Sequence, residues 1–455
     1  MSFIIAALAL ASIGAAPALA SAPRAPAASE PSLAEHAATA PLLTKTVAYE
    51  LLKSQGIRWH QTELLPLDAE SLRIQAEAAL QPHMGFAARE MLTRTNLRQF
   101  GFTESGPMDL ITFGAAVAEF EIPVFDLKSR ARADAAKMNE TLTRENMRQF
   151  QSDLTYGMLL TFVNTQRLAE KLKVIESNIG RNGEILKMAE AKLRSGAGIS
   201  IDVMRAKGLV ALENMRKLET ETNYRKSLRD LATMLGLPAI EGGVEPLTLN
   251  EIDIDAKDKF AKTGVDDRPD VKAAELTVLA AKEIKNEAES EFDPKVTMLG
   301  DVGVGGVSLI QGEGANLLGT IAIQVKFPIF DGHFFGAKVQ QSQVSVSKAV
   351  LQAQHTRLDA ESQIYNALDQ LETSRTAAAL ASEQVKLATE ELNIARRRFT
   401  SGSTSGVDLA SSQGNLSNAL NNYIDIVFGY EASKVNYFKS IGEFETYFAL
   451  EKKKK

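Results

Sequence analysis

Two long stretches of the chain carry apolar or small residues at every seventh position. In the later stretch two such seams run side by side, a pattern typical of helices that pack closely along their length. The first seam comprises Ile364, Leu371, Ala378, Val385, Leu392 and Phe399, and the second comprises Ala360, Ala367, Ser374, Ala381, Ala388 and Ala395. Shifted back by 206 residues, the first seam becomes Met158, Thr165, Leu172, Ile179, Leu186 and Leu193. A strict seven-residue repeat predicts left-handed supercoiling.

Proline and glycine mark the ends of these stretches at nearly the same offset. The phrases "FEIPVFD" and "KFPIFDG" precede the two stretches, and no proline follows within either stretch. Gly196 and Gly402 are 206 residues apart, and so are the acidic residues that follow them. Because proline does not continue a helix and glycine ends one, the sequence predicts long helices over 127–194 and 333–400. The repeated landmarks indicate an internal duplication. Each long helix would measure about 100 Å, which indicates a coiled coil or an assembly rather than a globular core.

Period-two alternation precedes each of the two phrases. Residues 294–304 and 317–330 place apolar side chains on one face and polar side chains on the other, and residues 109–125 also predict a strand. Residues 86–102 alternate only roughly. Four strands cannot close a barrel, because about eight is the smallest number that does, and open strand edges are not viable in lipid. We therefore expect several copies to pool their strands in a membrane and to continue as a ring of helices around a polar lumen.

Composition narrows the function. The 455 residues include no Cys and only five His, which excludes disulfides, thiol catalysis and a lipidated cysteine and makes a His-based metal site improbable. The net charge of -6 does not favour a nucleic-acid partner. No uncharged apolar run of 18 residues follows the N-terminal region. The opening "MSFIIAALALASIGAAPALA" predicts a signal peptide, with an uncleaved apolar anchor as the alternative.

One segment carries a specific resemblance. "RPDVKAAELTVLAAKEIKNEAESEFDPKVTMLG" (268–300) resembles the signature of the TolC-like outer membrane efflux protein family, or outer membrane factors. The phrases "IPVFD" and "FPIFDG" and the two glycine breaks match it too, over roughly residues 86–445. The resemblance implies an α+β, mainly α fold: a homotrimer with a twelve-stranded β-barrel in the outer membrane of a Gram-negative bacterium, continuing into a periplasmic α-helical coiled-coil barrel.

The resemblance also implies a function. Family members are exit ducts of tripartite efflux pumps or type I secretion systems, which conduct substrates passively. They dock onto a periplasmic adaptor (membrane fusion) protein and an inner-membrane transporter of the RND, ABC or MFS type. They have no catalytic site and no cofactor, and outer membrane lipid surrounds the barrel.

The expected segments follow from these patterns. They are a signal peptide (1–20), an Ala/Pro-rich linker with an N-terminal helical segment of one or two helices (21–85), a first repeat (86–245), a second repeat that begins with an Ala-rich helix (246–445), and a basic C-terminal tail (446–455).

The glycine breaks are the candidate functional site. Each break has a basic residue four positions before its glycine and an Asp six positions after it, which suits the ends of two successive helices. Ser405 and Asp408 have capping-box spacing, and Ser200 is a candidate cap for the other turn. The resemblance implies that the turns form the periplasmic tip. Candidates for adaptor docking are Lys192, Arg194, Gly196, Gly198, Arg398, Gly402 and Gly406, and candidates for a pore constriction are Asp202, Thr404, Ser405 and Asp408.

Two features depart from the family pattern, and two other hypotheses stay open. Ser411 stands where the family has a second acidic residue, and Thr404 stands where it has a basic one. The tip residues can also be read as helix caps and stops without a gating role. An exported structural coiled-coil protein without a barrel would explain the helices but not the alternating strands. An exported enzyme lacks support, because the sequence has no G-x-S-x-G, H-E-x-x-H or P-loop motif.

Overall fold

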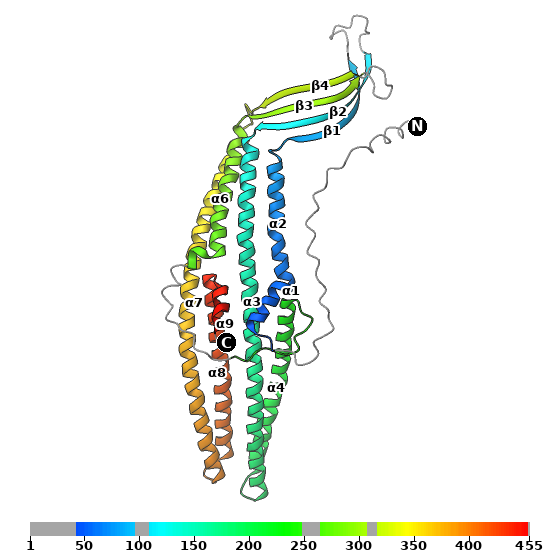
Figure 1. Ribbon diagram of the computed structural model, residues 1–455. Helices are drawn as coiled ribbons and strands as arrows, with labels where there is room; N and C mark the ends of the chain where they lie inside the picture. The colour runs from blue at the N-terminus through cyan, green and yellow to red at the C-terminus, as the bar shows by residue number, and fades with distance from the viewer. Residues whose placement is uncertain (1–41, 96–108, 248–263, 307–315, 454–455) are drawn as a thin grey trace, which may run out of the picture. The chain divides into compact units, whose positions relative to one another are not determined.

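The computed structural model describes residues 42–95, 109–247, 264–306 and 316–453 (Figure 1). From Leu42 onward the chain forms one compact unit. The expected signal peptide and the linker part over 21–41 lie outside the described residues. The chain is mainly helical with one four-stranded sheet, which confirms the α+β, mainly α fold class. Within the described ranges, no helix is both long and apolar enough to cross a membrane.

Two helical hairpins of matching dimensions dominate the molecule. The first pairs α3 (Leu127–Arg194, 68 residues) with α4 (Ser200–Leu235, 36 residues). The second pairs α7 (Phe334–Thr400, 67 residues) with α8 (Gly406–Ile441, 36 residues). The predicted long helices are therefore confirmed almost to the residue. The near-identical lengths also support the duplication that the offset predicted.

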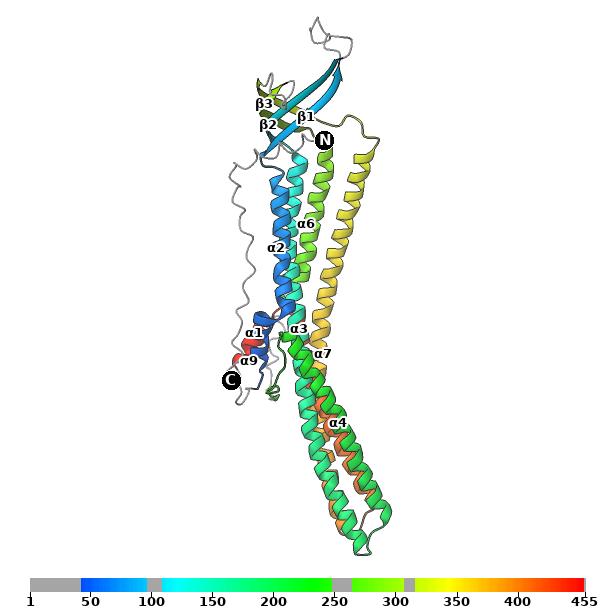
Figure 2. The ribbon, with the colours of Figure 1, turned by 90° about the vertical axis from the view of Figure 1, so that its right-hand side faces the viewer.

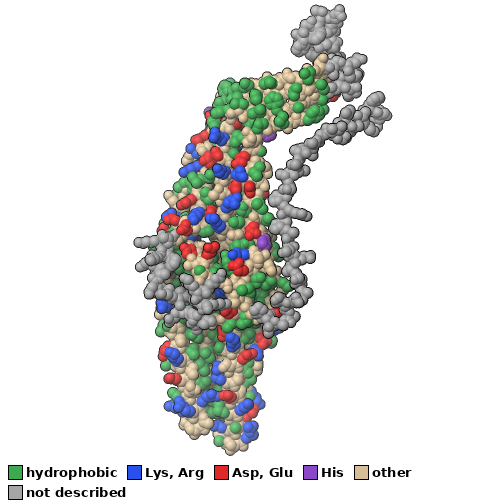
Figure 3. Space-filling model, viewed as in Figure 1, with side chains coloured by type: hydrophobic (Ala, Val, Ile, Leu, Met, Phe, Trp, Pro, Cys, Tyr) green, Lys and Arg blue, Asp and Glu red, His purple; other side chains and the backbone are tan. Residues whose placement is uncertain are grey.

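The sheet consists of β1 (His83–Thr95), β2 (Asp109–Phe125), β3 (Lys295–Gly306) and β4 (Asn316–Lys326), antiparallel and in chain order. The register sets Met298 beside both Ile122 and Ile323, so one face of the sheet is apolar. The same register sets Asp301 between Glu119 and Thr320 on the opposite, polar face. Figure 3 shows hydrophobic side chains gathered over the sheet, while charged side chains cover the helices.

Shorter helices precede the strands in both copies, and the ones nearest the sheet pack with the long helices in one layer. α1 (Lys45–Gln55) and α2 (Ile57–Ala78) precede β1, as α6 (Pro269–Glu289) and the short 3₁₀ turn η3 (Ser290–Phe292) precede β3. α2 packs on α3, α3 on α6, and α6 on α7. Further from the sheet, α4 packs on α3, α3 on α8, and α8 on α7 (Figure 2). One outer edge of the helix layer is therefore formed by α2 near the sheet and by α4 near the turns. The other outer edge is formed by α7 along its whole length.

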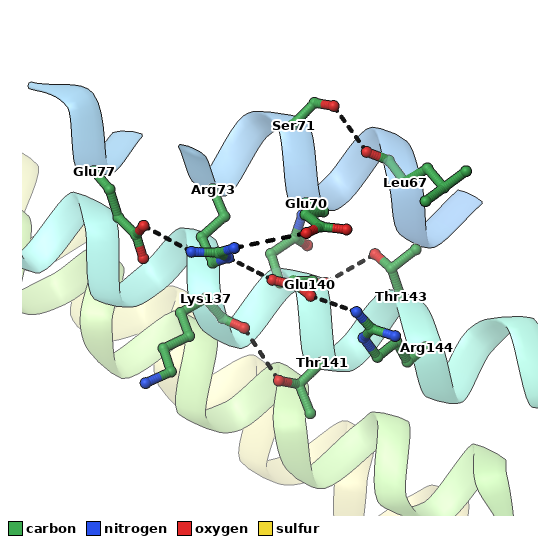
Figure 4. Close-up of polar contacts among 11 residues, drawn as sticks. Leu67, Glu70, Ser71, Arg73, Glu77, Lys137, Glu140, Thr141, Thr143 and Arg144 are labelled. Carbon is green, nitrogen blue, oxygen red and sulfur yellow. Dashed lines mark hydrogen bonds and ion pairs between the residues drawn. The ribbon is translucent and has the colours of Figure 1, made fainter. Parts of the chain in front are cut away.

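An ion-pair cluster holds α2 against α3 (Figure 4). The Arg73 guanidinium donates to Glu77 on its own helix and to Glu140 on α3, both at 2.7 Å. Glu140 also accepts a hydrogen bond from Arg144, which lowers the pKa of its carboxyl. The α2 helix contains Pro66 in its interior, so the rule that proline ends helices holds for the long helices but fails here.

The heptad positions predicted to be buried are mostly buried in α7, but in α3 the buried positions differ from the predicted ones. In α7 the predicted positions are buried, apart from Ala378 and Val385, which are half-buried. In α3 the prediction is wrong beyond Thr165, because Leu172, Ile179 and Leu186 are half-buried and Leu193 is exposed. The buried residues there are instead Ile175, Asn178, Asn182, Ile185 and Ala189. The physical reason is that α3 packs against both α4 and α8, which turns its buried face away from the one that α7 uses.

The C-terminal segment also differs from the expectation. Instead of a basic tail from 446, the chain forms α9 (Phe444–Lys453), whose first turns are buried. Phe448 stacks on Tyr49 of α1 with ring centroids 4.2 Å apart, and Tyr447 lies 5.4 Å from Phe438 of α8. These aromatic contacts join both ends of the described chain to the end of α8, so the residues up to Phe448 belong to the core.

Candidate functional site at the hairpin turns

Both hairpins turn on a glycine in the left-handed conformation. Gly196 and Gly402 each have φ of 78°. After Gly196, the Ala197 N–H donates to the Lys192 carbonyl at 3.0 Å while the glycine N–H donates to Leu193 at 3.1 Å. This pair of bonds is a Schellman motif, and the second turn repeats it with the carbonyls of Arg398 and Phe399. The predicted role of the two glycines as helix stops is confirmed.

The second turn carries a complete capping box at the start of α8. The Ser405 side chain accepts from the Asp408 N–H at 3.2 Å, and the Asp408 carboxylate accepts from the Ser405 N–H at 3.3 Å. The Thr404 hydroxyl donates to the same carboxylate at 2.6 Å, and the Ser405 hydroxyl donates at 2.9 Å. These hydrogen bonds, with Thr404 the strongest, hold the pKa of Asp408 below its ordinary value. The carboxylate is nevertheless exposed.

The first turn is built differently. Ile199 occupies the N-cap position of α4 without a side-chain hydrogen bond, so the expectation that Ser200 caps this helix is wrong. Gly198 lies tightly against the end of α3, because a Cβ atom there would lie 2.9 Å from both the Leu193 nitrogen and the Lys192 Cβ. Asp202 lies in the first turn of α4 as predicted, with Arg205 at 3.9 Å.

Two residues of the first turn contact the second turn. The Lys192 ammonium donates to the Phe399 carbonyl and lies 3.8 Å from the centroid of the Phe399 ring. The Asp202 carboxylate lies against Gly406, where a Cβ atom would be only 2.5 Å from its Cγ. Of the predicted set, the structure therefore brings Asp202 against Gly406 across the turns and brings Thr404 and Ser405 onto Asp408 within the second turn. Lys192 contacts Phe399, which was not in the predicted set. The structure leaves Arg194 and Arg398 exposed beside the turns.

A further contact, between the long helices of the two hairpins, was missed by sequence reasoning. Glu184 on α3 forms an ion pair with Arg396 on α7, within the helices that lead to the two turns. Charged residues at many helix positions look alike in a sequence, so no signal marks this pair. The carbonyl of Phe399 as a lysine acceptor was equally invisible, because backbone atoms leave no trace in a sequence. Among the residues that the structure describes, no group of three or more His, Asp or Glu side chains could hold a metal ion.

The arrangement defines a class of protein. A small sheet with one apolar face, followed in each of two copies by a long helical hairpin, is the fold of a group of bacterial outer membrane channels. The structure of the outer membrane protein VceC from Vibrio cholerae matches it with a TM-score of 0.77 and 18% identity, covering 88% of this chain and 96% of that one. At that identity the match speaks for the fold alone.

The family follows from the sequence. The model of the outer membrane efflux protein family matches residues 68–237 and 265–434, and the chain belongs to this family. Each matched segment covers one copy of the duplicated unit, and the first begins within α2, before the boundary expected at 86. The resemblance of the sequence to TolC-like proteins is thereby confirmed. The protein is an outer membrane protein with a periplasmic part, in a family of channels rather than enzymes.

Curated relatives agree with this assignment. Nodulation protein T of Rhizobium leguminosarum bv. trifolii is 26% identical over 269 residues, which cover 57% of this chain and 56% of that protein. The pyoverdine export outer membrane protein OpmQ of Pseudomonas putida is 23% identical over 385 residues, covering 82% of this chain and 80% of that protein. The chain thus spans little more than half the length of the first of these relatives.

Proposed function

We propose that three copies of this chain form the exit duct of a tripartite efflux system. Each copy would contribute four strands to a twelve-stranded barrel in the outer membrane, and two hairpins to a helical tube in the periplasm. Substrates would pass through passively. The observation that carries the proposal is that one copy has complementary open edges, both in its sheet and in its helix layer.

The helix layer exposes apolar stripes on its two outer edges. On α4 the stripe has heptad spacing and includes Gly208 and Ala211 between larger residues, which are Ile201, Met204, Met215 and Leu218. On α2 it comprises Ile57, Leu64, Leu67 and Ile74. On α7 it comprises Val344, Leu351, Leu358 and Tyr365 near the sheet, and Leu380, Leu387 and Ile394 near the turns. Burying such stripes against a neighbouring copy is favourable, and α7 is long enough to cover both α2 and α4 of that neighbour.

The sheet, like the helix layer, has two open edges. β1 and β4 are its two outer strands, and within the described residues neither has a partner on its outer side. Unpaired backbone groups are costly in lipid, so a copy that enters the membrane must pair β4 with β1 of the next copy. Three copies supply twelve strands, enough to close a barrel with an open lumen. The apolar face would meet lipid and the polar face would line the lumen.

The remaining roles follow from the position of the turns. The turns lie at the end of the hairpins remote from the sheet, so they would face the inner membrane (Figure 1). We assign adaptor docking to the exposed surface around Arg194 and Arg398, and a ring of three carboxylates at the entrance to Asp408. The inner-membrane partner would be a transporter of the RND, ABC or MFS type. The name of the OpmQ relative, a pyoverdine exporter, favours small molecules as cargo over secreted proteins.

A cysteine cross-link tests the assembly. Met215 and Leu387 both lie about four helical turns from the tip, on the two edges that should meet. Because the chain contains no Cys, a Met215→Cys/Leu387→Cys variant reports only the introduced pair. In membranes this full-length variant should give covalent dimers and trimers on oxidation. The matched control is Met215→Cys/Leu351→Cys, since Leu351 is on the same stripe but roughly 54 Å further along α7.

The control should stay monomeric on a denaturing gel. Equal cross-linking of both pairs, or none in a protein that retains its helix content, would contradict the proposed ring. The alternative of an exported coiled-coil protein without a barrel predicts a chain that remains soluble without detergent after it is processed.

A further inference from the structure

The contact between the two hairpins of one copy includes a polar level, at which buried hydrogen bonds join three helices. The Nδ2 group of Asn178 on α3 donates to the Ser417 hydroxyl on α8 at 2.9 Å. That hydroxyl donates to Oε1 of Glu213 on α4 at 3.1 Å. All three side chains are buried. The partly exposed Arg216 donates to the same Oε1 atom at 3.0 Å, so one oxygen of the Glu213 carboxylate accepts two hydrogen bonds.

A second polar level lies four residues, or about 6 Å, closer to the hairpin turns. Because α3 and α8 run antiparallel, a step of four residues along each helix leads from the first level to Asn182 and Gln413. The Nδ2 group of Asn182 donates to the Leu209 carbonyl at 3.4 Å, so α4 also reaches this level. Asn182 is 2% exposed and Gln413 is 1% exposed. The two amides therefore belong to the interior of the contact between the hairpins.

Four polar atoms at these two levels have no hydrogen-bond partner among the described residues. They are Oε2 of Glu213, Oδ1 of Asn182, and both Oε1 and Nε2 of Gln413. Gln413 is the extreme case, because neither its donor nor its acceptor is paired. Buried polar groups in folded proteins almost always have a partner, since an unpaired one is costly. The four atoms therefore point to a small polar ligand between the hairpins.

Water fits this set of atoms better than a cation does. A water molecule accepts and donates, so one molecule can accept from Gln413 Nε2 and donate to Asn182 Oδ1 and Glu213 Oε2. A cation would bind the oxygen atoms alone and would leave the Gln413 donor unpaired. The Arg216 guanidinium also lies beside the carboxylate already, which disfavours a second positive charge there.

Apolar packing encloses the two polar levels on both sides. Toward the hairpin turns lie Ala206 and Leu409, which belong to one buried cluster. Toward the sheet lie Ile424 and Phe428, which belong to another. When two helices part, apolar side chains lose their contacts, whereas groups already bonded to water exchange one water for another. Parting the hairpins is therefore easier where the hydrated levels interrupt the apolar contact.

We propose that Asn182, Glu213 and Gln413 form a hydrated site that binds at least one ordered water molecule between the two hairpins of a copy. The site lets the part of the hairpins next to the turns open while the part next to the sheet stays closed. Both statements concern contacts within one copy, so they go beyond the proposed ring and do not depend on it.

A high-resolution cryo-electron microscopy map of the full-length protein in lipid nanodiscs tests the water directly. We expect density for water within hydrogen-bond distance of at least two of the four atoms. A direct hydrogen bond from the Gln413 amide to Asn182 or Glu213, with no density between them, would overturn the site. Density that only oxygen atoms surround would identify a cation and would overturn it as well.

Single cysteines report the opening, because the chain contains no Cys. Ala206→Cys lies on α4 between the hydrated site and the turns, and Ser227→Cys lies on α4 between the site and the sheet. Ala206 is 3% exposed and Ser227 is 5% exposed, so a thiol reagent reaches either position only when the helices part. In the native protein position 206 should react faster than position 227. Equal rates, or no reaction at 206, would contradict opening on the side of the turns.

A variant without the two amides tests whether the hydrated site causes the opening. Asn182→Leu/Gln413→Leu puts apolar side chains of similar size at both positions. It should slow the reaction at 206 by about tenfold and leave 227 unchanged, because a dry contact costs more to open. The matched control is Asn418→Leu, an exposed amide of the same helix, which should change neither rate. An unchanged or faster reaction at 206 in the double variant would overturn the role of the site.

The proposal stays testable if the double variant does not fold. The map and the comparison of position 206 with position 227 both leave Asn182, Glu213 and Gln413 in place. The map alone decides whether water is bound, and the two labelling rates decide where the hairpins open.

Discussion

A buried carboxylate joins the N-terminal part of the described chain to the end of the second hairpin. Glu431 on α8 lies between the ammonium groups of Lys434 on its own helix and of Lys45 on α1, the latter at 3.4 Å. All three side chains are buried. Burial alone would raise the pKa of Glu431, but the charges and hydrogen bonds of the two lysines outweigh it and hold the pKa below its ordinary 4.5. Glu431→Gln keeps the shape and removes the charge.

The magnitude follows from what the substitution leaves behind. Two buried ammonium groups would share a neutral amide, and removing one partner of a buried ion pair costs about 3–5 kcal/mol of unfolding free energy. The matched control is Glu383→Gln, whose partner Lys386 has the same i,i+3 spacing at 3.2 Å but lies on an exposed face. Exposed ion pairs contribute about 0–1 kcal/mol, so Glu383→Gln should hardly change the unfolding free energy.

The assay is denaturant unfolding of the full chain, followed by far-ultraviolet circular dichroism at one fixed protein concentration, because assembly affects apparent stability. A carboxyl group with a lowered pKa contributes stability above its ordinary pKa of 4.5 and loses it as the pH falls through the lower value. The difference between wild type and Glu431→Gln should therefore shrink below pH 4.5. If Glu431→Gln is as stable as Glu383→Gln at neutral pH, the reasoning about the buried pair is refuted.

The turns give three further predictions. Gly196→Ala and Gly402→Ala should each lower the unfolding free energy by about 1–2 kcal/mol in the same assay, because an alanine is strained at φ of 78° although no atom lies in the way of its Cβ. Asparagine at either position should lower the unfolding free energy less. As a control, Gly414→Ala within α8, where the new Cβ also meets no atom, should raise the unfolding free energy by about 1 kcal/mol. Asp408→Ala should change the conductance of reconstituted channels while the trimer stays folded. Ser405→Ala weakens the cap but keeps the charge of Asp408, so it should leave the conductance unchanged. Equal conductance in Asp408→Ala and wild type would contradict the assignment of Asp408 to the gate. Because hydrogen bonds hold the pKa of Asp408 below 3.8, its effect on conductance should persist down to that pH and disappear only below it.

Backbone landmarks made most of the fold predictable. Pro123, Gly196 and their partners in the second copy limit where helices can start and stop, since they act through φ and the loss of a donor rather than through distant contacts. The structure accordingly matches the expected long helices closely. The strand expected over 86–102 was the weakest pattern, and β1 forms over His83–Thr95 because β2 supplies a complete ladder of partners. The remainder of that expected strand lies outside the described residues.

Packing was predictable for the seam that α7 forms with α8, but not for α3, which packs against several helices. The seam of α7 follows the heptad, whereas α3 lies between α4 and α8 and buries Asn178 and Asn182 in place of predicted apolar positions. A sequence gives the period of a seam but not the number of neighbours that share it. The same limit applies to α9, where "YFALEKK" looks like a polar end, although Tyr447 packs against Lys45 of α1 and Phe438 of α8.

The two turns illustrate how duplication preserves geometry while contacts diverge. Both keep the left-handed glycine, because any side chain there would strain the backbone. The neighbouring residues are under no such constraint. Lys192 reaches across to the Phe399 carbonyl, whereas Arg398 at the equivalent position is exposed. Asp408 is engaged by its own capping box, whereas Asp202, which has no capping serine, lies against Gly406 of the other turn. The contact between the two turns is therefore made by side chains of the first turn, and the second turn keeps its carboxylate exposed to solvent.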